Sequence, residues 1–433
     1  MEDMILTNEM STAMDLINGT NHHVFITGKA GSGKTTFLKY LIQNCSKSCI
    51  VAAPTGIAAI NAGGVTLHSL FLFPFRPMSP VEPIDFKISK GNRKVLSKIR
   101  MLIIDEVSMV SPDVIDMMDR KLRWIRKSQE PFGGVQIVMF GDLFQLPPVV
   151  KTDEKPIFDA FYDGYFFFNA LVWKQVGFHV VELSHVFRQK DQSFVDVLNH
   201  VRNYKMDSND LDVLSEIKDK ATSEMFTGNY IHICTHKREV DKINSTLLGK
   251  PTWSSESVIE GKFSTSAVPC DITLKLRVGA RVMAISNNSK QGYYNGMLGW
   301  VVGFEDNKVV VQADNGAVIQ FEPYRWVNNQ FEIKDGNVVA TEIGACTQYP
   351  LTLAWAITIH KSQGLAFDNV ALHVKHTFCP GQLYVALSRC RTLEGIASDA
   401  YITKKMVIPE KSLEDFERIY KENDHWFGRR LND

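Results

Sequence analysis

The sequence contains no apolar stretch near the ~20 residues that a membrane-spanning helix needs. Its first residues, MEDMILTNEMS, are acidic, and they have neither the basic-then-apolar order of a secretory signal nor the arginine-rich pattern of an organellar one. No membrane role and no targeting segment are therefore expected. The chain is predicted to be soluble and intracellular, cytoplasmic in a prokaryote or nuclear in a eukaryote.

Paired cysteines and an excess of charge are also missing. Seven cysteines are scattered from Cys45 to Cys390 without a C-x-x-C pair or histidines at zinc spacing, which excludes a zinc ribbon and favours a reducing compartment. Lysine plus arginine equal aspartate plus glutamate at 48 each, so binding of a polyanion requires basic residues gathered in one place. A chain of 433 residues has room for roughly two to four domains.

A complete phosphate loop, GKAGSGKT, occupies residues 28–35. A short buried-type strand precedes it and helical apolar spacing follows it, which is the order that this motif requires. The glycines let several backbone N–H groups point at phosphate oxygens, Lys34 adds a point charge, and Thr35 can place its hydroxyl on Mg²⁺. The predicted ATP-binding residues are Gly28, Ala30, Gly31, Ser32, Gly33, Lys34, Thr35 and Thr36.

A carboxylate pair ends the apolar run at residues 101–104. Asp105 is predicted to hold Mg²⁺, and Glu106 to act as the base that polarises the attacking water. A surface Asp-Glu pair is the alternative. Gln145 follows another apolar run in GDLFQLPPV and is predicted to sense the γ phosphate from the same carboxyl edge of a parallel sheet. The fold class is therefore α/β, with the catalytic groups on loops at one sheet edge.

Short apolar strands that alternate with helices occur in two successive groups along the sequence. This pattern predicts two parallel-sheet domains in tandem. The second group is HVVELS, YIHICT, VALHV and AYIT. An aromatic, proline-rich stretch interrupts the first group, and six basic residues without an acidic one lie from Lys87 to Arg100. Short β segments divided by turn signals interrupt the second group and predict a small β-barrel. The first predicted domain comprises residues 1–67 and 92–178, with an inserted arm at 68–91. The second comprises residues 179–280 and 345–433, with an inserted β module at 281–344.

The second domain has no phosphate loop but contains arginines in distinctive settings. Arg188 in SHVFRQ and Arg389 in LYVALSRCR are predicted to stabilise charge on the γ phosphate from across a cleft. Each arginine taken singly is better explained by a surface salt bridge. Residues 354–364, AWAITIHKSQG, end in hydrogen-bond donors suited to phosphates, and Gln363 and Gly364 are assigned to the nucleotide.

These motifs together carry a family resemblance over nearly the whole chain. The succession GKAGSGKTT, APTGIAAINAGGVTLHSLF, IIDEVSMV, PFGGVQIVMFGDLFQLPPV, HVFRQ, AITIHKSQG and YVALSRCR resembles a superfamily 1, group B DNA helicase of the Pif (petite integration frequency) type. The stretch DVIDMMDRKLRWIRKSQEPFGGVQ resembles the signature segment of that family. The resemblance implies two RecA-like domains that clamp one ATP, an SH3-like β insertion, and ATP-dependent DNA unwinding with movement 5′ to 3′ along a single strand.

The resemblance also implies a DNA path, with single-stranded and forked duplex DNA as partners and a monomer as the working form. Replication, repair, recombination and telomere maintenance are the processes that it suggests, while G-quadruplexes and RNA–DNA hybrids stay open as substrates. Phe73 beside Arg76 supplies a stacking face with a cation, although a small hydrophobic core beneath the arm explains the phenylalanine as well. The predicted DNA-contacting residues are Thr55, Gly56, His68, Phe73, Arg76, Pro147, Thr235, His236, Asn244, Thr358, His360 and Lys361.

Two other functions and one departure from the family pattern stay open at this point. A DNA-dependent ATPase clamp would hydrolyse ATP without separating strands, and a small-molecule phosphotransferase would be indifferent to DNA. Met10 stands where relatives often carry a glutamine that reads adenine, so adenine selectivity is not assured.

Overall fold

The computed structural model describes residues 6–74, 76–83, 87–187, 191–219, 230–263, 268, 270–288, 290–334, 337–422 and 426–427. The chain divides into two compact units. Unit 1 comprises residues 1–188, 329–341 and 410–433, and unit 2 comprises residues 189–328 and 342–409. Among the described residues, no helix combines the length and the apolar character that crossing a membrane requires.

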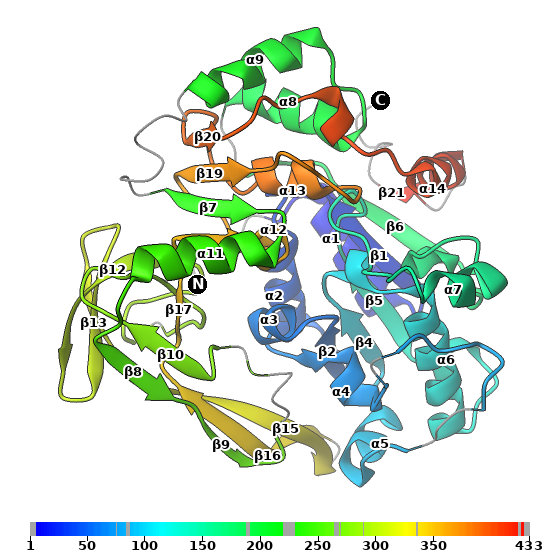
Figure 1. Ribbon diagram of the computed structural model, residues 1–433. Coiled ribbons are helices and arrows are strands. Elements are labelled where there is room, and N and C mark those ends of the chain that lie inside the picture. The colour runs from blue at the N-terminus through cyan, green and yellow to red at the C-terminus, as the bar shows by residue number, and fades with distance from the viewer. Residues whose placement is uncertain are drawn as a thin grey trace. The chain divides into compact units, whose positions relative to one another are not determined.

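Unit 1 contains a seven-stranded sheet whose neighbouring strands all run parallel (Figure 1). Its central strands are buried on both faces, as is usual for a parallel sheet covered by helices. In spatial order the strands are β21 (Trp426–Phe427), β6 (Phe178–Leu183), β1 (His23–Gly28), β5 (Gln136–Phe140), β4 (Met101–Ile104), β2 (Cys49–Ala53) and β3 (Val65–Thr66).

Four of the described helices of unit 1, α1, α3, α4 and α5, begin after a residue whose side chain accepts a hydrogen bond from one of the first backbone N–H groups. Thr7, Thr55, Thr66 and Ser89 each accept such a hydrogen bond through a side-chain oxygen. The α-helices are α1 (Asn8–Gly19), α2 (Lys34–Asn44), α3 (Gly56–Asn61), α4 (Leu67–Phe71), α5 (Lys90–Leu96), α6 (Pro112–Arg126), α7 (Lys155–Phe161) and α14 (Lys411–Glu422), and the 3₁₀ helices are η1 (Val107–Met109), η2 (Pro131–Gly134), η3 (Phe167–Asn169) and η4 (Trp173–Gln175).

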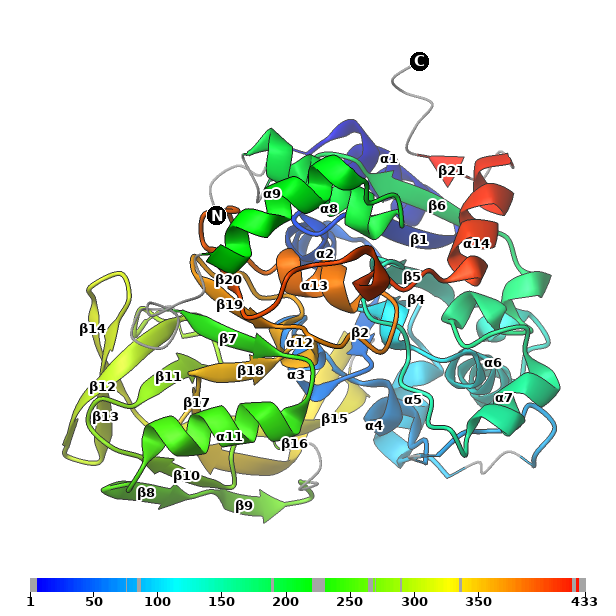
Figure 2. The ribbon, with the colours of Figure 1, turned by 45° about the horizontal axis from the view of Figure 1, so that its top comes forward.

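Two segments that the sequence assigned to the second domain belong to unit 1, so that assignment is wrong. Strand β6 pairs along its whole length with β1, and β21 extends the same sheet beyond β6. Figure 2 shows β21 and α14 beside β6. On α14, Phe416 packs against the rings of Phe168 and Trp173. Apolar patterning indicates that a segment is a strand, but the choice of partner depends on packing between residues far apart in the chain.

Unit 2 contains a second parallel sheet, so the predicted α/β fold with two parallel sheets is confirmed. Helix α11 packs on β7 and β18, while α8 and α9 lie on the side of β20 (Figures 1 and 2). The predicted strand at residues 400–403 is wrong, because the strand ends at Ser398. The strands in order are β18 (Ala356–Thr358), β7 (Ile231–Cys234), β19 (Val370–His373) and β20 (Ile396–Ser398), and the helices are α8 (Gln192–Arg202), α9 (Ser208–Asp219), α11 (Lys237–Leu248), α12 (Ile359–Ser362), α13 (Gln382–Leu387) and η6 (Lys404–Met406).

Antiparallel strands fill the region in which the sequence predicted a β module. An antiparallel sheet joins β14 (Val318–Phe321), β13 (Lys308–Ala313), β12 (Leu298–Glu305), β11 (Arg281–Ala284) and β17 (Leu351–Leu353). Two smaller sheets join β10 (Thr273–Leu276) to β8 (Trp253–Glu256), and β15 (Tyr324–Lys334) to β16 (Asn337–Gln348) and β9 (Val258–Gly261). The β content therefore begins earlier, at β8, and ends later, at β17, than the predicted limits of 281–344.

The segment from α6 to β5, which carries the family signature, is organised by buried carboxylates. Asp116 accepts the backbone N–H groups of Leu171 at 3.0 Å and Val172 at 2.9 Å. Asp119 accepts the N–H of Phe132, which adopts a left-handed conformation with φ of 51° inside η2. A buried N–H group without a partner costs free energy, so these carboxylates fix the turn and the loop on α6.

We expect Asp116→Ala to lower the free energy of unfolding by about 3 kcal/mol, because two buried N–H groups lose a charged acceptor. Urea denaturation followed by circular dichroism measures this change. Asp15→Ala is the matched control, since Asp15 is exposed on α1, and it should change stability by less than about 0.5 kcal/mol. Equal stability of Asp116→Ala and the unchanged chain would contradict the structural role.

Candidate functional site

The phosphate loop connects the end of β1 to the start of α2. Gly31 and Gly33 have φ of 81° and 84°, a left-handed conformation that favours glycine, and Gly33 is the residue that precedes α2. This backbone turns the first N–H groups of α2 toward the loop. Thr35 and Thr36 are exposed at the start of the helix, and Ala30 is buried.

Two polar groups of the loop fit a phosphate ligand. The Lys34 ammonium donates to the carbonyls of Gly28 at 2.7 Å and Lys29 at 3.0 Å, so the cation is held over the loop. The Ser32 hydroxyl oxygen is buried, and no described residue forms a hydrogen bond with it. A phosphate oxygen would satisfy this hydroxyl and the exposed N–H groups. Met10 is buried in the core beside Gly33, so its side chain offers no polar contact to a base.

The carboxylate pair lies where the sequence predicted it, directly after β4. Burial, and after it the charge of Glu106, raises the pKa of Asp105 to about 7, while the charge of Lys34 acts in the opposite direction. The N–H of Glu106 donates to Asp105 at 2.9 Å, and Glu106 itself has φ of 50°, an uncommon conformation for this residue type. A divalent cation would favour the ionised carboxylate, so the donor set fits Mg²⁺.

Gln145 lies in the loop after β5 and is buried. Its backbone N–H donates to the Asp142 carbonyl at 3.0 Å, and its side-chain amide contacts the Asp142 carboxylate at 3.4 Å. In the sheet, Ile26 of β1 is aligned with Phe140 of β5, so the loops after these strands emerge at the same edge. The structure therefore brings the phosphate loop, Asp105, Glu106 and Gln145 together.

Of the second-domain residues assigned to ATP, Gln363, Gly364 and Arg389 belong to unit 2. Arg389 is buried in unit 2, where its guanidinium donates to the carbonyls of Ser362 at 3.1 Å, Leu365 at 3.0 Å and Val385 at 2.9 Å. These hydrogen bonds tie α13 to the turn at Gln363 and Gly364. Arg188 lies outside the described residues. Its neighbour Phe187 donates a backbone hydrogen bond to Gly31 at 2.9 Å, a contact that the sequence did not reveal.

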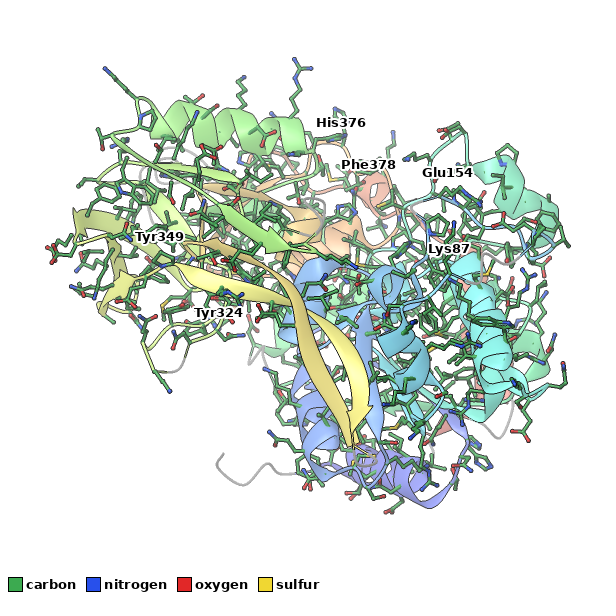
Figure 3. All side chains as sticks on the ribbon, turned by 90° about the horizontal axis from the view of Figure 1, so that it is seen from below. Lys87, Glu154, Tyr324, Tyr349, His376 and Phe378 are labelled. Atoms are coloured by element: carbon green, nitrogen blue, oxygen red, sulfur yellow. The ribbon has the colours of Figure 1, made fainter. Side chains whose placement is uncertain are left out.

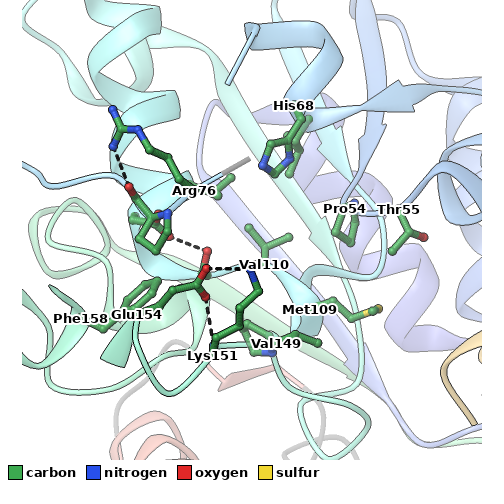
Figure 4. A pocket seen from close by; sticks show the side chains of 16 residues that line it. Pro54, Thr55, His68, Arg76, Met109, Val110, Val149, Lys151, Glu154 and Phe158 are labelled. Atoms are coloured by element: carbon green, nitrogen blue, oxygen red, sulfur yellow. Dashed lines mark hydrogen bonds and ion pairs between the residues drawn. The ribbon is translucent and has the colours of Figure 1, made fainter. Parts of the chain in front are cut away.

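Three predicted DNA-contacting positions of unit 1 surround one pocket of about 320 Å³. Thr55, His68 and Arg76 line it together with Pro148 and Lys151 (Figure 4). Burial lowers the pKa of His68, which favours a neutral imidazole that hydrogen-bonds or stacks and does not form an ion pair. Gly56 starts α3 directly after Thr55, and Pro147 is half-buried next to Pro148.

The stacking role predicted for Phe73 is wrong in this structure. Phe73 is 5% exposed, its ring stacks on Phe71 with centroids 5.2 Å apart, and the Lys121 ammonium lies 5.2 Å from the ring centroid. The hydrophobic core beneath the arm is therefore the correct alternative. Arg76 is exposed and pairs with Glu82 at 3.1 Å.

In unit 2, the loops that follow β18 and β7 carry the remaining predicted DNA contacts. Thr358 accepts the N–H of Lys361 at 3.2 Å and so starts α12, while burial lowers the pKa of His360. Thr235 is buried next to the exposed His236, with 2.8 Å between the hydroxyl oxygen and Nδ1. These strands are hydrogen-bonded neighbours, so their carboxyl ends place both loops at one edge.

Asn244, another predicted DNA contact, has a structural role in unit 2. Its side chain donates to the carbonyl of Ala356 at 2.9 Å and accepts the N–H of the same residue at 2.8 Å. This pair of hydrogen bonds fixes α11 on the first residue of β18.

Phe378 is a candidate contact that the sequence analysis missed. It is 56% exposed on the loop after β19, and its ring centroid lies 4.9 Å from that of His236. The buried Gln382 accepts the N–H of Phe378 at 2.9 Å, so the loop backbone is anchored. Figure 3 shows His376 and Phe378 on this loop. An exposed aromatic ring on a fixed loop beside a histidine suits base stacking.

Comparisons with known proteins agree with this geometry. The family model described as PIF1-like helicase matches residues 5–212. The ATP-dependent DNA helicase Pif1 of Bdellovibrio bacteriovorus is 30% identical over 97% of this chain and 93% of its own length. A crystal structure of Bacteroides sp Pif1 in complex with ADP-AlF4 has 61% identity and a TM-score of 0.91, covering 99% of this chain and 100% of that one. Bacteroides Pif1 bound to ssDNA has 61% identity and a TM-score of 0.76 over the same shares. The chain belongs to the family of PIF1-like helicases, which are ATP-dependent DNA helicases.

Proposed function

We propose that this helicase moves 5′ to 3′ along single-stranded DNA and separates duplex DNA at a fork, with one ATP consumed per step between two RecA-like domains. The observation that carries the proposal is the pair of parallel sheets, of which one has a phosphate loop and the other has none. The loops at the carboxyl ends of their strands contain the residues that are candidates for binding nucleotide and DNA. The direction rests on the resemblance to the Pif family. A monomer inside the cell is part of the proposal, with G-quadruplexes and RNA–DNA hybrids as further substrates.

In the proposed mechanism, unit 1 performs the chemistry of hydrolysis. Lys34 and the loop N–H groups bind the β and γ phosphates, and Thr35 and Asp105 would hold Mg²⁺, which neutralises phosphate charge when bound. Glu106 accepts a proton from the attacking water, and Gln145 orients that water. These roles need no covalent intermediate on the protein.

Arg188 and Arg389 are proposed to stabilise the transition-state charge when the domains close. For Arg389 this role requires the guanidinium to exchange some of its carbonyl acceptors at 362–365 for phosphate oxygens. Such an exchange would link ATP to the turn at Gln363 and Gly364 and to the adjacent candidate DNA-binding segment at Thr358–Lys361. This link supports coupling between ATP hydrolysis and DNA binding.

The DNA path is proposed to run over the loops at Thr55–Gly56 and His68 and at Thr235–His236 and Thr358–Lys361, with Phe378 stacking on a base. Neutral imidazoles at His68 and His360 suit contacts with bases and sugars, since neither adds a charge. All six basic residues from Lys87 to Arg100 are exposed, which supports contact of the arm with duplex phosphates. The antiparallel sheets formed by strands between residues 253 and 353 are proposed to act as the SH3-like module of the family.

We expect Glu106→Gln to keep ATP binding and to lower turnover by about 10²–10⁴-fold, because only the proton acceptor is lost. Lys34→Ala should lose ATP affinity as well as turnover. A fluorescent ATP analogue measures binding, and phosphate release with saturating oligonucleotide measures turnover. Loss of nucleotide binding in a folded Glu106→Gln variant would refute the assignment of Glu106 as base.

A forked duplex tests the direction of movement. Unwinding should require hydrolysable ATP, proceed from a 5′ single-stranded tail, and fail with a 3′ tail of the same sequence. Strand separation is followed by fluorescence of a dye–quencher pair. DNA-stimulated hydrolysis without separation from either tail would instead support the ATPase clamp.

We expect Phe378→Ala to weaken binding to single-stranded DNA by about 5- to 150-fold, which corresponds to ~1–3 kcal/mol for one stacked base. Basal ATP hydrolysis should stay unchanged, and Phe378→Tyr should restore DNA affinity. Tyr401→Ala is the matched control, because Tyr401 is an exposed aromatic residue of unit 2 outside this loop. Fluorescence anisotropy of a labelled oligonucleotide measures all affinities, and equal affinities of Phe378→Ala and the control would remove Phe378 from the DNA path.

A further inference from the structure

A group of metal-ligating side chains lies in unit 2 apart from the residues assigned to ATP. Glu239 is in the first turn of α11, His373 is the last residue of β19, and Asp399 follows β20. His373 Nδ1 lies 3.1 Å from Asp399 Oδ2 and 4.0 Å from Glu239 Oε1. One ligand atom from each of the three residues lies within 4.8 Å of the other two. These separations allow one small cation to contact all three with minor side-chain adjustment.

The imidazole of His373 is supported in the way that metal-binding histidines usually are. Its side chain is 6% exposed, and its second nitrogen, Nε2, lies 2.8 Å from Nδ1 of His232 on the neighbouring strand β7. Without an ion, the 3.1 Å separation fits an Nδ1–H that donates to Asp399. Binding of a cation would release this proton and leave Nδ1 as the ligand atom, with Nε2–H donating to His232. The backbone N–H of Asp399 donates to Leu372 at 3.1 Å, which holds Asp399 beside His373.

The carboxylate of Asp399 has an unused acceptor. Its Oδ1 atom is buried and has no hydrogen-bond partner among the residues that the structure describes, while Oδ2 contacts His373 and lies 3.3 Å from the ammonium of Lys375. A carboxylate oxygen without a donor beside it is a suitable metal ligand.

We propose that Glu239, His373 and Asp399 form a binding site for one divalent transition-metal ion such as Zn²⁺, with His232 as the supporting residue behind His373. One imidazole and two carboxylates suit a borderline cation, and water completes the coordination. The two carboxylates balance the charge of the ion, so Lys375, whose side chain is 63% exposed, turns to solvent on binding. The ion ties the first turn of α11 to β19 and β20.

Zinc titration of the full-length chain by calorimetry tests the site. The chain is first freed of metal with a chelator, and excess MgCl2 is kept present to occupy magnesium-preferring carboxylates. We expect saturable binding of Zn²⁺ that Glu239→Gln and His373→Asn each weaken by at least about tenfold, and that His232→Asn weakens by about 10–100-fold. Co²⁺ in place of Zn²⁺ should give visible absorption bands that disappear in the same variants.

The cluster at His200, Asp207 and Asp210 supplies the matched control, His200→Asn. There the two aspartates already accept each other's backbone N–H groups at 2.8 and 2.9 Å, so no metal is expected to bind. Glu239 is partly exposed, so Glu239→Gln should fold even if His373→Asn does not, and thermal unfolding without metal checks both. Absence of saturable Zn²⁺ binding, or equal affinity of Glu239→Gln and the unchanged chain, overturns the proposal.

Discussion

The parallel register of β2, β4, β5 and β1 is the constraint on which the site of unit 1 depends. Ala52 is aligned with Ile104, Ile104 with Met139, and Phe140 with Ile26. Each strand therefore ends at the same level, and the residues that follow emerge side by side. Because hydrogen bonds between strands fix this register, a phosphate loop, a carboxylate pair and a glutamine loop meet without any side chain having to reach far.

Burial shifts the pKa of candidate functional groups in both units. It raises the pKa of Asp105 to about 7 and lowers the pKa of His68 and His360. A carboxyl that is costly to ionise alone becomes a good ligand once a divalent cation and a lysine share its surroundings. If the loops that carry His68 and His360 contact DNA as proposed, neutral imidazoles there would favour bases and sugars over phosphates as partners.

Several side chains form structural hydrogen bonds that constrain their functional roles. Asp116 and Asp119 hold backbone N–H groups around α6, Asn244 fixes α11 on β18, and Arg389 ties α13 to the turn before Leu365. The hydrogen bonds of Arg389 to the carbonyls of Ser362 and Leu365 are the contacts that its proposed role at the γ phosphate would have to exchange.

The sequence by itself determined the ATP chemistry, because a phosphate loop and a strand-terminal Asp-Glu pair are contiguous motifs whose geometry is local. It also determined that two parallel sheets form and that β segments are inserted. Only the tertiary structure decided that β6 joins the first sheet, that Phe73 is buried while Phe378 is exposed, and that Glu239, His373 and Asp399 meet. Those outcomes depend on strand partners and burial between residues distant in the chain, and the order of residues in a sequence does not encode them locally.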